Sequence, residues 1–238
     1  MVIGFLGGFV KPDRLVHSTT QVAAHLREQY PPEVYVQAFE NHRRDDAYRE
    51  IVRRLDQDHD GTLSTAEKQA ARIVIYGHSW GASETVALAR KLGRENIPVL
   101  LTIQVDSISK IGENDSVIPG NVEEAVNFYQ PHGFFHGQRA IRAADPARTR
   151  IVGNVRIDYK DNPITCPQYP WFDHVFMRSH TEIECDPKVW TQVESLIHLK
   201  LSPEGDDSGP QPGRRLRSVG AVDFDSFVSA LSPAPSTH

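Results

Sequence analysis

The sequence predicts an α/β domain with a doubly wound, mostly parallel β-sheet. The chain has 238 residues, a length typical of a single domain that buries a sizeable core. Short apolar runs of strand length alternate along it with segments of helical periodicity. Continuous apolar strands are typical of parallel sheets that are covered on both faces, and strand–helix alternation favours right-handed crossovers.

Each predicted element follows from its own residue pattern. Strands are expected where β-branched and other apolar residues run together, at Val2–Leu6, Val34–Phe39, Arg72–Tyr76, Pro98–Val105 and Thr149–Ile157. Helices are expected at Thr19–Gln29, Asp45–Leu55, Ala82–Leu92, Val122–Tyr129 and Lys188–Leu199. Asp186 and Pro187 precede the last helix and are typical of an N-cap residue and a first helical residue.

The composition changes near residue 202. The segment that follows, SPEGDDSGPQPGRRLRSVG, is rich in proline, glycine, serine and charge and offers little to bury. We therefore expect one folded domain over residues 1–201 and a flexible, disordered C-terminal tail over residues 202–238.

The charge balance and hydropathy exclude several functional classes. The chain has 31 acidic and 26 basic residues and a net charge of −5, which argues against a nucleic-acid-binding protein. No apolar run approaches the roughly 20 residues that span a bilayer, so we expect no integral membrane segment. The first residues lack the pattern of a signal peptide. We therefore expect a cytoplasmic location, with Cys166 and Cys185 as thiols. The oligomeric state stays open.

The strongest motif is the pentapeptide Gly77-His78-Ser79-Trp80-Gly81, a G-x-S-x-G sequence between a predicted strand and a predicted helix. A tight strand-to-helix turn exposes the serine hydroxyl, and the two flanking glycines avoid Cβ collisions with neighbouring elements. The N-terminus of the following helix favours negative charge that develops at the site. Ser79 is therefore the predicted nucleophile.

With this motif in this context, the sequence resembles the α/β-hydrolase superfamily, of the serine esterase and lipase-like kind, over most of residues 1–201. The resemblance implies a compact α/β-hydrolase fold and a triad in the order nucleophile, acid, histidine. It also implies an oxyanion hole with one N–H from the residue after the nucleophile, here Trp80. A second N–H is expected after the first strand, from Gly8 or Phe9.

The predicted acid is Asp106, which ends the apolar strand Pro98–Val105 at the edge of the sheet where ligands bind. The competing acids are Asp145, Asp158 and Asp161. The predicted base is His180, which we place on a loop just before the last helix, where the resemblance puts the histidine. Its main rival is His174, and the other candidates are His132, His136 and His198.

A second motif predicts a calcium site. Residues 56–67 read Asp-Gln-Asp-His-Asp-Gly-Thr-Leu-Ser-Thr-Ala-Glu and match the pattern D-x-[DN]-x-[DN]-G-x5-E at every specified position. Such a loop resembles an EF-hand loop, and it wraps Ca²⁺ with oxygen ligands at alternating positions. The expected ligands are Asp56, Asp58, Asp60, the Thr62 carbonyl, Ser64 and Glu67. The outgoing helix is short and no second loop is present, so a structural calcium ion is expected rather than a switch.

The sequence thus predicts a serine hydrolase that cleaves a small-molecule ester, thioester or amide through an acyl-serine intermediate. No organic cofactor is expected. Two alternatives stay open. One is a non-catalytic calcium-binding or interaction domain on a hydrolase scaffold. The other is an acyltransferase, in which another acceptor outcompetes water.

Overall fold

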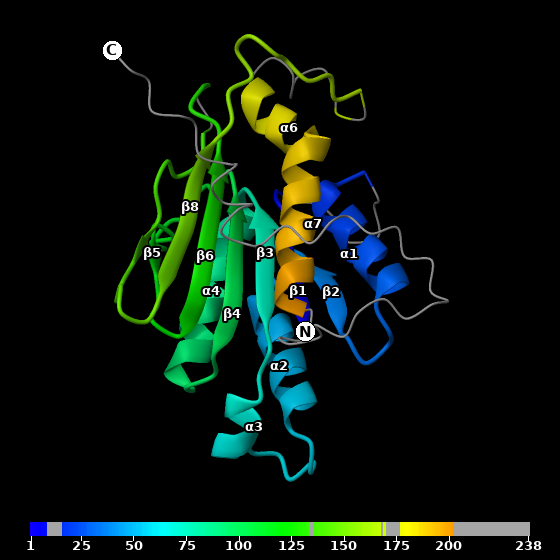
Figure 1. Ribbon diagram of the computed structural model, residues 1–238, viewed down its shortest axis with the longest axis vertical. Coiled ribbons are helices and arrows are strands. Elements are labelled where there is room, and N and C mark those ends of the chain that lie inside the picture. The colour runs from blue at the N-terminus through cyan, green and yellow to red at the C-terminus, as the bar shows by residue number, and fades with distance from the viewer. Residues whose placement is uncertain (9–15, 134–135, 168, 170–176, 202–238) are drawn as a thin grey trace, which may run out of the picture.

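The structure is a computed structural model, which describes residues 1–8, 16–133, 136–167, 169 and 177–201. Within these residues, six strands form one sheet in the order β2-β1-β3-β4-β6-β8 (Figure 1). Every neighbouring pair of its strands is parallel. The predicted α/β class with a mostly parallel sheet is therefore confirmed. The predicted tail, residues 202–238, lies outside the described residues.

The strands of the main sheet are short. They are β1 (Val2–Phe5), β2 (Val36–Phe39), β3 (Val74–His78), β4 (Val99–Val105), β6 (Val122–Tyr129) and β8 (Arg150–Arg156). A small two-stranded sheet pairs β5 (Val117–Ile118) with β7 (Arg142–Ala143). Strands β1, β3 and β4 are buried at every position, as central strands covered by helices on both faces require.

Helices cover both faces of the sheet (Figure 1). They are α1 (Ser18–Gln29), α2 (Arg44–Leu55), α3 (Thr65–Gln69), α4 (Trp80–Arg94), α6 (Arg178–Cys185) and α7 (Pro187–Leu201). Leu26 of α1 and Val193 of α7 share one apolar core with strand residues. Ile51 of α2 and Leu88 of α4 belong to a second core on the other face. The sheet is thus held between two apolar layers.

The start of α7 follows the prediction. Pro187 is its first residue, and the Asp186 carboxylate accepts a hydrogen bond of 2.8 Å from the backbone N–H of Lys188. Asp186 also accepts a hydrogen bond of 2.9 Å from the hydroxyl of Tyr159. This cap therefore fixes the junction between α6 and α7 as well as starting the last helix.

One predicted helix is wrong, because residues 122–129 form strand β6. Strand β6 lies between β4 and β8, and Ala125, Val126 and Phe128 are fully buried there. Pairing on both edges and burial on both faces outweigh the helix propensity of the two glutamates and the alanine in this segment. The β-branched and aromatic residues of the segment fit a buried strand.

The parallel strands all end at the same edge of the sheet. Figure 1 places α6 at this edge and α3 at the opposite end of the molecule. Residues that follow β1, β3 and β4 therefore come together near α6, whereas the predicted calcium loop lies at the other end. Each helix in the described part of the chain is too short or too polar to cross a bilayer.

Candidate active site

Ser79 lies at a sharp turn between β3, which ends at His78, and α4, which begins at Trp80. Its backbone has φ +56° and ψ −125°, a conformation that residues other than glycine rarely adopt. The backbone N–H of Ser79 donates a hydrogen bond of 3.0 Å to the carbonyl of Val105 on the neighbouring strand β4. The turn is thus anchored to the sheet while the serine side chain stands at its edge.

The two glycines of the pentapeptide make this turn sterically feasible. A Cβ on Gly77 would stand 2.5 Å from the carbonyl oxygen of Gly81. A Cβ on Gly81 would collide with the carbonyl oxygen of Phe5 on β1. Both contacts involve backbone, which cannot move aside cheaply, so glycine is required at both positions, as the sequence pattern indicates.

The structure brings the three predicted triad residues together. The hydroxyl oxygen of Ser79 lies 2.9 Å from Nε2 of His180, and Nδ1 of His180 lies 2.6 Å from Oδ2 of Asp106. All three side chains are buried. Ser79 and His180 are 101 residues apart in sequence, and Asp106 and His180 are 74 apart. The fold therefore assembles the cluster from β3, the end of β4 and α6.

Asp106 is held as a carboxylate by several donors. Its Oδ1 accepts a hydrogen bond of 2.8 Å from the N–H of Gly137, and its Oδ2 accepts one of 3.1 Å from the amide of Gln130. Burial by itself raises the pKa of Asp106, but hydrogen bonds from His180, Gln130 and Gly137 hold that pKa below its usual value. Gln130 and Gly137 carry no motif, and sequence reasoning missed them.

His180 lies in helix α6, not on the predicted loop. Helix α6 begins at Arg178 and ends at Cys185, directly before the cap of α7. The segment Arg178–Cys185 is too short to show a clear apolar period, so the sequence pattern did not distinguish a short helix from a loop. A helix fixes the imidazole direction more firmly than a loop, because its backbone is hydrogen-bonded internally.

The other described candidates for acid and base lie elsewhere. His132 pairs with Asp158 at 2.9 Å on the surface, and His198 lies 2.6 Å from the hydroxyl of Tyr30. The carboxylate of Asp145 accepts a hydrogen bond from the N–H of Ala147, Asp161 is exposed, and His136 is exposed too. His174 lies outside the described residues.

Two of the predicted oxyanion residues, Trp80 and Gly8, lie beside Ser79. Trp80 is the first residue of α4, so its N–H belongs to the positive end of that helix. Gly7 lies just after β1 and packs against the turn at Ser79. A Cβ on Gly7 would stand 3.1 Å from Cβ of Ser79. Gly8 has φ +55°, which glycine adopts without strain. Phe9 lies outside the described residues.

A cavity of about 130 Å³ opens beside Ser79. The two glycines after β1 line it, together with residues from α6 and the start of α1; the described lining residues are Gly7, Gly8, His17, His78, Ser79, Tyr169, Met177, His180, Thr181 and Glu184. The serine hydroxyl therefore faces a space that a ligand can enter.

Comparison of the chain with protein-family models and with curated proteins gives no match. A histidine that contacts a serine hydroxyl with one ring nitrogen and a carboxylate with the other can accept the serine proton and be stabilised as a cation. Such a cluster beside a cavity is suited to nucleophilic attack on a bound acyl group.

A second pair of ionisable side chains flanks this cluster, and sequence reasoning missed it. Nδ1 of His78 lies 2.7 Å from Oε2 of Glu184, and both side chains are buried. The ring of His78 stacks on the ring of His180 with centroids 4.6 Å apart. His78 and Glu184 are too far apart in sequence for any local pattern to have indicated the pair.

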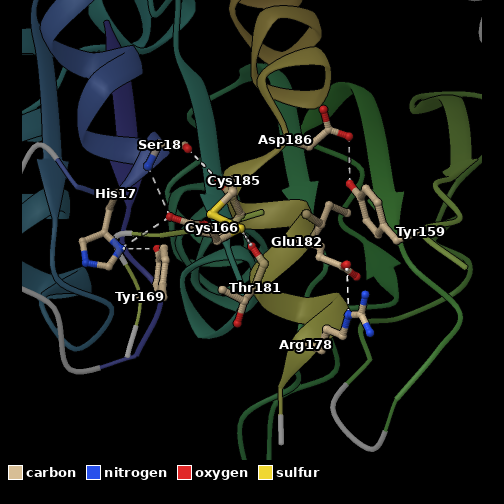
Figure 2. Close-up of a disulfide and its surroundings, with 12 residues drawn as sticks. His17, Ser18, Tyr159, Cys166, Tyr169, Arg178, Thr181, Glu182, Cys185 and Asp186 are labelled. Atoms are coloured by element: carbon tan, nitrogen blue, oxygen red, sulfur yellow. Dashed lines mark hydrogen bonds and ion pairs between the residues drawn. A yellow bond between two sulfur atoms is a disulfide. The ribbon is translucent and has the colours of Figure 1, made fainter. Parts of the chain in front are cut away.

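Cys166 and Cys185 form a disulfide, so the expectation of free thiols is wrong (Figure 2). Their Cα atoms are 5.9 Å apart, within the range that a disulfide spans. Cys185 is the last residue of α6, so the bond joins the helix that carries His180 to the segment before it. Disulfides persist mainly in oxidising compartments, which argues against the expected cytoplasmic location.

The predicted calcium loop follows α2 and includes the start of α3. The carboxylates of Asp56, Asp58 and Asp60 offer oxygen atoms within 4.8 Å of one another. Glu67 reaches back across the loop, where its Oε1 accepts a hydrogen bond of 2.7 Å from the N–H of Gln57. Its Oε2 accepts one of 2.9 Å from the N–H of Ser64, which caps α3. The three aspartates at the start of the motif and Glu67 at its end are therefore brought together around one loop.

Thr62 and Leu63 lie in the second half of the loop. The hydroxyl of Thr62 donates a hydrogen bond of 2.8 Å to Asp60, and its predicted contribution as a ligand is the backbone carbonyl. Leu63 packs against the core that also contains Leu55 and Ile73. The apolar position of the motif thus attaches the exposed loop to the domain.

Proposed function

We propose that the protein is a serine hydrolase of the α/β-hydrolase type that cleaves an ester, thioester or amide. The observation that carries this proposal is the chain of contacts from the Ser79 hydroxyl through both ring nitrogens of His180 to Asp106. The strained turn at Ser79 and the cavity beside it support the same interpretation.

In the acylation step, the Ser79 hydroxyl oxygen attacks the acyl carbon while Nε2 of His180 takes its proton. Asp106 accepts the hydrogen bond from Nδ1 of His180 and stabilises the imidazolium that forms. His180 then gives this proton to the leaving group as the bond to the acyl carbon breaks. The products of the step are a free alcohol, thiol or amine and an acyl-serine.

In the deacylation step, a water molecule takes the place of the leaving group. Nε2 of His180 removes one proton from the water as its oxygen attacks the acyl carbon. The bond to the Ser79 oxygen then breaks, and His180 returns the proton to that oxygen. The carboxylic acid leaves and the serine hydroxyl is regenerated, so the cycle consumes one water molecule.

Negative charge develops on the acyl oxygen in both steps, and hydrogen-bond donors are needed to stabilise it. In this mechanism the N–H of Trp80 is the first donor, because it lies at the positive end of α4 directly after the nucleophile. The N–H of Gly8, a residue that lines the cavity beside Ser79, is the proposed second donor. Phe9 stays the alternative for this second position.

The size of the cavity favours a compact acyl group. The volume of about 130 Å³ lies below the roughly 300–1,000 Å³ that is typical of pockets for drug-sized ligands. We therefore expect p-nitrophenyl acetate and butyrate to be cleaved faster than the palmitate ester. An active enzyme that prefers the palmitate ester would contradict this size limit without contradicting the mechanism.

The decisive experiment is labelling with a fluorophosphonate probe, followed by an ester assay. The wild type should be labelled at Ser79, and Ser79→Ala should lose labelling and at least about 10⁴-fold in kcat. Ser195→Ala removes a serine on the surface of α7 and serves as the matched control. A wild type that is neither labelled nor active would instead favour the non-catalytic alternative.

The acyltransferase alternative uses the same residues, so only the products separate it from hydrolysis. In the presence of an added alcohol or amine, a hydrolase releases mainly the free acid. Predominant transfer of the acyl group to the added acceptor would identify an acyltransferase.

We further infer that residues 56–67 bind a calcium ion that stabilises the fold. The donor set is entirely oxygen, as Ca²⁺ prefers, and Asp56, Asp58, Asp60, Thr62, Ser64 and Glu67 would hold the ion. One oxygen of the Asp56 carboxylate, Oδ1, is shielded from solvent and has no hydrogen-bond partner among the described residues. Such an atom fits a position that a cation satisfies.

A further inference from the structure

The carboxylate of Glu184 is contacted from two other segments of the candidate site. Its Oε2 lies 2.7 Å from Nδ1 of His78, the residue that precedes the nucleophile. Its Oε1 accepts a hydrogen bond of 3.2 Å from the N–H of Ser18 and lies 3.5 Å from Nδ1 of His17. One side chain of α6 therefore joins the turn at Ser79 to the beginning of α1.

The backbone of Glu184 reinforces the connection to α1. The hydroxyl of Ser18 donates a hydrogen bond of 2.6 Å to the carbonyl of Glu184. His17 in turn lies 2.9 Å from the hydroxyl of Tyr169, in the segment before α6. Figure 2 shows His17, Ser18 and Tyr169 together on one side of the disulfide. Segments from three parts of the chain thus meet at this end of α6.

Glu184 is also placed to act on His180. It follows His180 by four residues in the same helix, so the two side chains lie on one face. His78 contacts Glu184 through Nδ1 and stacks on the imidazole of His180 at 4.6 Å, with an angle of 27° between the rings. The imidazole of His180 therefore contacts Ser79 and Asp106 through its two nitrogens and the ring of His78 through its face. Glu184 in turn holds the ring of His78.

The charges of this pair fit its burial. Burial by itself raises the pKa of Glu184, but His78 and His17 hold that pKa well below its usual value. Burial by itself lowers the pKa of His78, but Glu184 and Asp106 raise it above its usual value. A buried carboxylate with a charged partner is a strong anchor, because either charge alone would be costly to bury.

We propose that Glu184 is a positioning residue of the site: it ties α6 to His78 and to the start of α1, so that the His180 imidazole stays aimed at Ser79. This proposal rests on the proposed function. A displacement of about 1 Å between reacting groups lowers rates by as much as about 10²-fold, so an anchor one helical turn from the base affects catalysis.

Helix α6 provides a matched control for this proposal. Glu182 is also buried, yet its carboxylate contacts Arg178 of the same helix at 3.2 Å. Figure 2 shows the Arg178–Glu182 pair on the side of the disulfide away from His17. Glu182→Gln therefore removes a buried charge from the same helix without touching His78, Ser18 or the cavity.

The experiment compares Glu184→Gln, Glu184→Ala and Glu182→Gln with the full-length wild type. Glu184→Ala should lower kcat by about 10²-fold, and Glu184→Gln by roughly 10-fold, because glutamine keeps an oxygen for the N–H of Ser18 but loses the charge facing His78. KM should change less than about threefold in both, because a positioning role does not require a substrate contact. Glu182→Gln should keep the wild-type kcat.

Two measurements keep the test decisive if Glu184→Ala does not fold. The isosteric Glu184→Gln is labelled with the fluorophosphonate probe. Its labelling rate, relative to that of the wild type, should fall in proportion to its kcat. The low-field NMR signal of the His180 proton that faces Asp106 should shift or broaden in the same variant and stay unchanged in Glu182→Gln. This signal reports the imidazole position without any turnover.

The outcomes separate this proposal from the proposed function. An unlabelled, inactive wild type would contradict the function itself. A labelled, active wild type with unchanged kcat, labelling rate and low-field signal in Glu184→Gln would overturn the positioning role of Glu184. A raised KM with unchanged kcat would overturn it too, because Glu184 would then contribute to substrate binding instead.

Discussion

Ser79 and Asp106 both have positive φ values, +56° and +44°, although neither is a glycine. Such conformations cost about 1–3 kcal/mol each and persist only where the surroundings enforce them. At Ser79 the neighbouring strand and the glycine contacts enforce the turn. At Asp106 the backbone of Gly137 approaches closely. A Cβ on Gly137 would stand 2.4 Å from the carbonyl carbon of Asp106. Strain at these two residues is therefore part of how the site is built.

The His78–Glu184 pair predicts a pH dependence of stability. The pKa of His78 is raised in the folded state, so its contribution is complete below pH 6.5, its usual value, and is lost as the pH rises through the folded value. The pKa of Glu184 is lowered, so its contribution is complete above pH 4.5 and is lost as the pH falls. The free energy of unfolding that the pair provides should therefore be greatest between these values.

Urea unfolding of the wild type and of Glu184→Gln between pH 4 and pH 8 tests this dependence. In the wild type, the proton of His78 contributes a fall of at most about 1.4 kcal/mol per pH unit above pH 6.5. The groups that face the pair are His17, Asp106 and His180, and they are unchanged in the variant. The slope above pH 6.5 should be smaller in Glu184→Gln, and an identical slope would contradict the prediction.

At the scale of single elements, β6 and α6 show how tertiary contacts decide between local alternatives. The segment Val122–Tyr129 has both helix-forming and strand-forming residues, and its place between β4 and β8 makes it a strand. The segment Arg178–Cys185 is short, and its contacts with α1 and with the disulfide keep it in place as a helix. Neither result follows from the periodicity of the segment alone.

The disulfide should stabilise α6 and the segment before it. It joins cysteines 19 positions apart, and for a loop of this length the loss of chain entropy in the unfolded state gives about 3 kcal/mol. Dithiothreitol should therefore lower the Tm of the wild type by about 6–12 °C. The double variant Cys166→Ala, Cys185→Ala should melt lower from the start and should not respond to dithiothreitol. A wild-type Tm that is insensitive to complete reduction would contradict this role.

At the scale of the whole molecule, the candidate active site and the calcium loop lie at opposite ends of the sheet (Figure 1). The loop precedes β3, and Ser79 follows that strand. A bound ion would therefore affect the entry of β3 into the sheet rather than the reacting groups. Its effect is expected on global unfolding.

Calcium at about 100 times its Kd should raise the free energy of unfolding by about 2.7 kcal/mol. The corresponding rise in Tm is about 5–10 °C for a domain of this size, measured against a chelator. Glu67→Gln should abolish the rise, while the ester activity at 25 °C should stay the same with and without calcium. An unchanged Tm, together with no calcium found by elemental analysis, would contradict the calcium site.

Much of the fold was predictable from the sequence, because the patterns that indicate it involve residues that are close together in the chain. The apolar runs of β1, β3 and β4 indicate buried parallel strands, and the glycines around Ser79 indicate the turn. The prediction of Ser79 relied on the same local signals, whereas that of Asp106 and His180 also relied on the resemblance to the α/β-hydrolase superfamily, which implies the order nucleophile, acid, histidine. The structure places these three side chains within hydrogen-bonding distance, and their catalytic roles stay a prediction.

The sequence by itself determined the α/β class, the turn at Ser79 and the acidic loop, because each depends on residues that are neighbours in the chain. Only the tertiary structure decided that residues 122–129 pair as a strand, that Cys166 joins Cys185 and that Glu184 contacts His78. These contacts join residues between 19 and 106 positions apart or depend on the neighbouring strands. Local propensity carries no information about such partners, whereas burial and backbone pairing in the folded chain select them.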